Sequence, residues 1–190
     1  MKAHLGLHNH IVAAFVLVFL SCLPLGAQTV DQTAKLDALF AQLLTADEES
    51  SQAIESDIWL EWSKSGSPAM DLLLERGRQA LADGHPETAI EHLTALIDHA
   101  PDFAEGWNAR ATAYYETGDF GPAIADIGHV LTLNPRHFGA LAGLGAIFEE
   151  LDKPAQALEV YKAALAIHPH APGLNEAVER IQTQLSGSDL

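Results

Sequence analysis

Histidine is the residue type in this chain that most readily suggests chemistry, because neutral imidazole binds metals and carries protons. His85, His92 and His99 recur every seven residues, and His168 and His170 flank a proline. The first three are expected in a turn, within a helix and near that helix's end, so they cannot converge on one ion. The last two could share only a weak surface metal with a nearby carboxylate. We therefore predict no metal site.

Other catalytic patterns are missing from the sequence. Cys22 is the only cysteine and lies in a segment expected to be removed, and neither Gly-x-Ser-x-Gly nor HExxH occurs. Gly143-Leu144-Gly145 begins like a dinucleotide loop, but no third glycine follows, and close helix packing explains these glycines better. We predict neither an enzyme nor a cofactor. The alternative is an enzyme with an unrecognised site, which a pocket of buried acids or bases would reveal.

A pair of tryptophans, Trp59 and Trp62, precedes a stretch rich in Ser, Gly and Pro. The pair could form the aromatic wall of a binding site, or it could be packing. Ile54, Ile58 and Trp62 share one helical face at i, i+4 and i+8, which favours packing. We expect this face to cap the helix that contains residues 72–76, and burial of the indoles would test the expectation.

The N-terminal segment is typical of a secretory signal peptide (residues 1–27). Lys2 precedes an apolar run from Ile11 to Leu20 that is too short to span a bilayer, and cleavage is predicted after Ala27. Residues 28–35 would then form a linker. The alternative is lipidation of Cys22, although the residues before it match the lipoprotein pattern poorly.

The acidic charge restricts the class of partner. The formal net charge is −16, which repels nucleic acids and anionic lipid surfaces. No nucleic-acid partner is expected, and membrane contact is expected only if Cys22 is lipidated. A basic or neutral partner would be attracted, although the charge could also serve solubility alone.

An internal period of 34 residues organises most of the chain. Pro101, Pro135 and Pro169 lie one period apart. Four further columns keep this spacing: Ala89, Ala123 and Ala157; Gly77, Ala111 and Gly145; Leu73, Trp107 and Leu141; Leu93, Ile127 and Tyr161. Apolar spacing within each period predicts two helices, and the small columns would let their backbones approach closely. The predicted units are residues 70–103, 104–137 and 138–171.

These columns resemble the tetratricopeptide repeat (TPR). The resemblance implies an all-α, right-handed helical solenoid of three repeats. Residues 36–69 are predicted as an N-terminal helical pair, either a cap or a degenerate repeat, and residues 172–190 as a C-terminal capping helix and tail. The layout is also similar to small exported TPR proteins of Gram-negative bacteria, which implies a periplasmic location.

The resemblance also implies a binding site, because the first helices of TPR repeats line a concave groove that holds a peptide or a partner's helix. Carried over by position, the groove residues are Arg78, Glu105, Asn108, Thr112, Tyr115, Glu116, Glu149 and Glu150. The cationic clamp with which some family members hold a C-terminal carboxylate is mostly absent, since small or apolar residues occupy its positions. We therefore expect a basic or apolar protein segment as partner. The alternative is that these side chains are only solvated surface.

Overall fold

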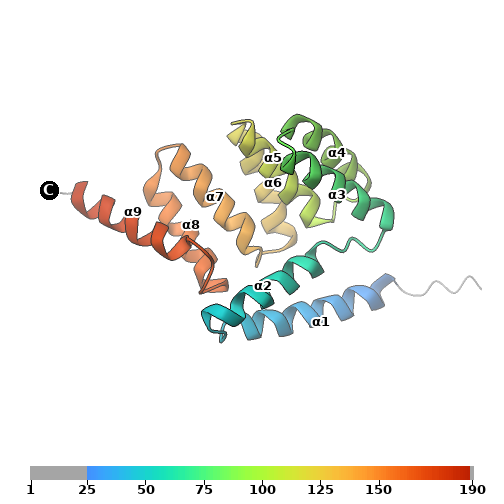
Figure 1. Cartoon of the computed structure of the whole chain (residues 1–190), viewed down its shortest axis with the longest axis horizontal. Helices are drawn as coiled ribbons and strands as arrows, with labels where there is room; N and C mark the ends of the chain where they lie inside the picture. Colours follow the sequence, from blue (N-terminus) through green and yellow to red (C-terminus); the bar gives the residue numbers. More distant parts are fainter. Residues whose placement is uncertain (1–24, 189–190) are drawn as a thin grey trace, which may run out of the picture.

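The computed structural model describes residues 25–188, with side chains over 31–187. Cys22 and most of the predicted signal peptide lie outside this range, so their processing stays a prediction. Within it the chain forms nine helices (Figure 1): α1 (Leu25–Leu43), α2 (Glu48–Trp62), α3 (Pro68–Ala82), α4 (Pro86–His99), α5 (Ala104–Glu116), α6 (Phe120–Leu133), α7 (Phe138–Glu150), α8 (Pro154–Ile167) and α9 (Leu174–Ser188). None of these helices is long and apolar enough to cross a membrane.

Helices α3 to α8 form three successive hairpins, and these confirm the predicted all-α solenoid of three repeats. The small columns explain the close approach within each hairpin. A Cβ atom added at Gly77 would lie 2.5 Å from the Leu93 side chain, and one added at Gly145 would collide with Tyr161. Ala89 and Ala157 on the second helices are fully buried. The small residues that recur every 34 positions therefore lie where the two helices of each hairpin are in close contact.

Helix α9 closes the C-terminal end of the row, as predicted. Ile181 is fully buried against α8 in a cluster with Ala157 and Tyr161. Acidic and amide side chains on the other face of α9 stay exposed, so the apolar surface of the last repeat meets a helix whose outer side is polar.

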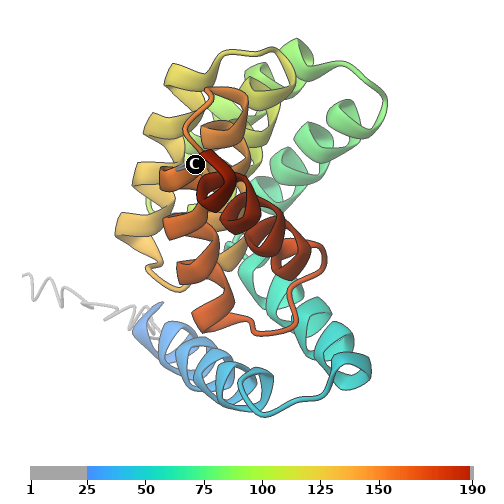
Figure 2. The same cartoon turned by 90° about the vertical axis from the view of Figure 1, so that its left-hand side faces the viewer.

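The N-terminal helical pair does not pack where the sequence analysis predicted. Helices α1 and α2 lie side by side along the lower edge of the row of repeats (Figures 1 and 2), and their aromatic cluster reaches Phe138 at the start of α7. The expected cap over residues 72–76 is therefore wrong, and Leu72 remains 50% exposed. The physical reason is that the outer face of α3 is mostly polar, with Glu75 and Arg76 exposed, whereas the start of α7 offers an aromatic surface.

The predicted linker at residues 28–35 is also wrong, because these residues belong to α1. The helix continues there because polar side chains bind α2. The Gln32 amide donates to the Glu61 carbonyl (2.7 Å), and the Lys35 ammonium pairs with the Glu61 carboxylate (2.5 Å). Lys64 pairs with the same carboxylate at 2.6 Å. Glu61 therefore joins the two helices of the pair.

Candidate functional site

A hollow of about 170 Å³ opens on the concave side between α5 and α7. It is lined by Asn108, Ala111, Thr112, Tyr115, Ile127, Gly139, Ala140, Gly143, Ala146 and Ile147. Three of the eight predicted groove residues, Asn108, Thr112 and Tyr115, are among these lining residues. The predicted set thus contains residues on the α5 side of the hollow and none of the lining residues on α7.

The α7 side of the hollow is formed by a stripe of small residues. Gly139, Gly143 and Ala146 follow the spacing i, i+4 and i+7, which places them on one helical face. The nearest atom to a Cβ added at Gly143 would be the Ile127 methyl at 3.9 Å, so a ligand side chain has space beside this residue. This spacing was the sequence signal that could have revealed the stripe.

The C-terminal ends of α5 and α7 form an acidic rim beside Tyr115, which is one of the lining residues. Glu116 and Glu150 are exposed, and Tyr115 is half-buried beside them. Burial raises the pKa of the Tyr115 hydroxyl, and the charges of Glu150 and Glu116 together with a hydrogen bond to Glu150 raise it further. The rim therefore presents a neutral phenol between two carboxylates.

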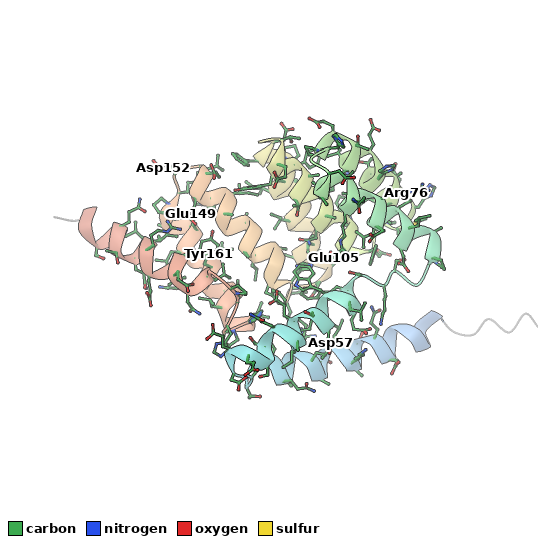
Figure 3. All side chains as sticks on the ribbon, in the orientation of Figure 1. Asp57, Arg76, Glu105, Glu149, Asp152 and Tyr161 are labelled. Carbon is green, nitrogen blue, oxygen red and sulfur yellow. The ribbon has the colours of Figure 1, made fainter. Side chains whose placement is uncertain are left out.

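Glu105 does not line the hollow and is closed off from solvent, which corrects the sequence prediction that it is open to a ligand. Its side chain is only 1% exposed and lies between the repeats and α2 (Figure 3). Its carboxylate accepts from Arg78 at 2.9 Å, contacts His137 at 3.2 Å and lies 3.3 Å from the Asn108 amide nitrogen. A buried carboxylate needs such partners, because an unpaired charge in the interior is costly.

His137 connects this buried acid to the N-terminal pair. Its Nδ1 accepts the Ala140 backbone N–H at 3.0 Å, so the ring proton of the neutral imidazole lies on Nε2 and is donated to Glu105. The ring is fully buried and stacks on Trp62 with a centroid distance of 4.2 Å. The Trp59 ring contacts His137 edge-on at 5.5 Å. Both indoles are thus used in packing at this contact.

Arg78 is not a free cation in the groove. One guanidinium nitrogen donates to the Ser63 hydroxyl at 2.9 Å, and the other pairs with Glu105. Ser63 ends α2, so this arginine connects the first repeat with the N-terminal pair. A ligand carboxylate would have to compete with Glu105 for it.

Glu149 also lies away from the hollow, which is a second correction to the predicted set. Its carboxylate accepts from the Tyr161 hydroxyl at 2.9 Å and pairs with Arg180 at 2.7 Å, and Figure 3 shows it beside Tyr161. The Arg180 guanidinium holds the pKa of Glu149 below its usual value. This acid fastens α9 to α7 and α8.

Among the described histidines only His137 and His168 are buried, and both serve packing; His85, His99, His129 and His170 are exposed. His168 is fully buried, with Nε2 3.1 Å from Glu55 on α2, so it cannot share a surface metal with His170 as the sequence had suggested. In the described residues no three His, Cys, Asp or Glu side chains are placed to hold a metal ion. His137 and His168 both contact α2.

Comparison with known sequences agrees with the repeat pattern. A family model described as tetratricopeptide repeat matches residues 74–128 and 108–172. A TPR repeat-containing protein of Rhizobium etli is 35% identical over 155 residues, which cover 81% of this chain and 76% of that protein. Small glutamine-rich tetratricopeptide repeat-containing protein 2 of Saccharomyces cerevisiae is 27% identical over 132 residues, and the chain spans only 37% of its length.

Solved structures with similar folds include a peptide complex. The first TPR of Spaghetti (RPAP3), bound to the HSP90 peptide SRMEEVD, superposes with a TM-score of 0.59 at 25% identity, and covers 62% of this chain and 93% of that one. MamA superposes with a TM-score of 0.59 at 18% identity, and covers 74% of this chain and 84% of that one. The second likeness concerns the fold alone.

Proposed function

The chain belongs to the tetratricopeptide repeat family, and on that premise we propose that it is a non-catalytic interaction protein whose concave groove binds a basic or apolar segment of a partner protein. Domains of this family act as protein-interaction modules, and a solved relative holds a peptide. The observation that carries the proposal is the hollow between α5 and α7, with its apolar floor and its acidic rim.

The chemistry of the groove supports this class of segment. The floor is apolar, and a volume of about 170 Å³ accommodates one large aliphatic or aromatic side chain. Beside it, Glu116 and Glu150 would pair with a Lys or Arg of the ligand, and Tyr115 offers a ring for cation–π contact. The peptide in the Spaghetti complex is acidic, SRMEEVD. A peptide of that charge would be repelled by this rim, and Arg78 is already paired.

The test reverses the charge of the rim and of nothing else. In Glu116→Lys/Glu150→Lys the partner captured by chemical crosslinking from an envelope extract should fall at least tenfold, because two attractive charges become repulsive. Helical content should stay constant. The matched control is Glu87→Lys/Glu91→Lys on α4, where both acids are exposed and far from the lining residues. Equal capture by the rim variant, or no partner in any sample, would contradict groove binding.

We propose that the protein is exported to the periplasm. The apolar run at residues 11–20 and the small residues before Gln28 support this location. The alternative is a TPR lipoprotein of an envelope assembly complex, acylated at Cys22. Cys22→Ala separates the two: a tethered protein moves from the membrane fraction to the soluble fraction, whereas a cleaved periplasmic protein fractionates as before.

A further inference from the structure

Helix α2 lies on the concave side of the repeats, next to the hollow. Arg78, Thr112 and Ala146 occupy the same position in the three repeats. Thr112 and Ala146 line the hollow, and Arg78 binds Ser63 at the end of α2. Gly139 also lines the hollow, and a Cβ added there would lie 2.5 Å from the Trp59 ring. Helix α2 therefore covers the part of the groove formed by the first turns of α5 and α7.

Long side chains make this contact, and the backbones stay apart. Successive repeat helices share extensive close backbone contact, whereas in the described residues α2 has such contact only with α1. Trp59 and Trp62 reach the rings of His137 and Phe138, and Glu55 reaches His168. The contact resembles a ligand in a groove more than a further repeat in the stack.

The contact is also incompletely satisfied. The indole nitrogen of Trp62 and the Nδ1 of His168 are buried and have no hydrogen-bond partner. An unsatisfied buried polar group is destabilising, so docking of α2 stabilises less than its aromatic area suggests. Both side chains contact across the surface between α2 and the repeats, and the Trp62 indole nitrogen, on α2 itself, would gain water when α2 leaves.

The charge of the concave side favours an occupant that differs from α2. Helix α2 carries five acids and no basic residue: Glu48, Glu49, Glu55, Asp57 and Glu61. The groove that it borders carries Glu105 beneath it and Glu116 and Glu150 at the rim. A basic helix with the same aromatic pair would therefore complement this acidic side of the repeats better than α2 does.

We propose that α2 is a displaceable intramolecular ligand of the concave groove. The competing partner segment is a basic amphipathic helix with two aromatic residues three positions apart, which replaces Trp59 and Trp62. Displacement uncovers Glu105 and Phe138 and extends the groove from the hollow to the first turns of α5 and α7. This inference rests on the proposed function for the identity of the groove, whereas release of α2 is a property of the chain alone.

Hydrogen exchange of the full chain tests the release without any partner. Gly139→Ala adds a methyl group against the Trp59 ring, so exchange of the α1 and α2 amides should rise at least tenfold while α5 to α8 stay protected. Gly128→Ala is the matched control, because a Cβ there meets nothing within 4 Å. If the amides of α1 and α2 exchange in step with those of α5 to α8 in every variant, α2 is an integral part of the fold and the proposal is overturned.

A peptide tests the replacement. The probe has the sequence of residues 46–64 with Glu48, Glu49 and Asp57, all exposed in the chain, changed to Lys. It should bind a Trp59→Ala chain, in which α2 is loosened and the surface beneath it is unchanged, at least tenfold more tightly than the native chain, and a probe with both tryptophans changed to Ala should not bind. Equal affinity for the two proteins, or binding without the tryptophans, overturns the proposal. Because neither measurement uses the Glu116/Glu150 rim, failure here leaves the groove proposal standing.

Discussion

The regions around the two ends of α7 contain similar residue types, a carboxylate and aromatic rings, but these have different roles. At its start, Glu105 and His137 form a buried, paired cluster that Trp59 and Trp62 of α2 cover. At its end, Glu150 and Tyr115 form an open rim that faces solvent. Carboxylates and aromatic rings stabilise the fold where another helix covers them, and they are available to a ligand where no helix does. Burial, which composition does not reveal, separates the two roles.

The largest expected effect is at the covered end. Trp62→Ala should lower the free energy of unfolding of the N-terminal pair by about 3–5 kcal/mol, because a buried ring that contacts Phe40, Trp59, His137 and Phe138 is lost. Urea denaturation followed by circular dichroism should show the pair melting first. Trp62→Phe, which keeps a stacking ring, should lose much less. An unchanged curve for Trp62→Ala would mean that the covered end is not held by this ring.

Glu105→Gln should cost about 1.5–3 kcal/mol, because the amide loses the charge-assisted hydrogen bonds to Arg78 and His137. The loss is measured as a shift of the urea midpoint at constant slope. A double variant with Arg78→Met should cost less than the sum of the single changes, since the two residues are one interaction. Strict additivity would show that the buried pair is not coupled.

Glu150→Gln should change stability by less than about 0.5 kcal/mol, because the side chain is exposed at the rim. Crosslinked partner capture should nevertheless fall several-fold. The difference between the two ends of α7 would be contradicted if Glu150→Gln destabilised the protein as strongly as Glu105→Gln. It would also be contradicted if Glu105→Gln weakened partner capture and Glu150→Gln did not.

The smallest effect is the pH dependence of α9. Because Arg180 lowers the pKa of Glu149 below its ordinary 4.5 in the folded chain, the pair stabilises the cap fully above that value and is lost as pH falls through the lowered pKa. Protection factors of α9 amides should therefore decrease between about pH 6 and pH 3 relative to α7. In Glu149→Gln this difference between α9 and α7 should vanish.

The repeats could be predicted because their evidence is local and periodic. Gly77 and Gly145 show in the sequence where hairpins close, and α9 shows an apolar stripe. The position of α2 could not be predicted. The spacing of Trp59 and Trp62 predicts that both rings are buried, but it does not show against which surface. Which surface covers them depends on Phe138 and His137, residues more than seventy positions away with no period to connect them.

The site was half-predictable for the same reason. Position in the repeat correctly brought Asn108, Thr112 and Tyr115 to one face. It also selected Glu105 and Glu149, whose carboxylates do not line the hollow and instead bind His137 beside α2 and Arg180 on α9. A position in a repeat determines where a Cα lies. It does not determine what a long side chain will find beyond its own repeat.

The contacts of α2 reach Arg78 in the first repeat, His137 at the end of the second, and Phe138 and His168 in the third. In an ordinary solenoid each repeat interacts only with its neighbours, so unfolding spreads from the ends one unit at a time. A helix that binds the first and third units directly removes that freedom. While α2 is docked the three repeats should unfold as one cooperative unit, and once it is released they should fray separately.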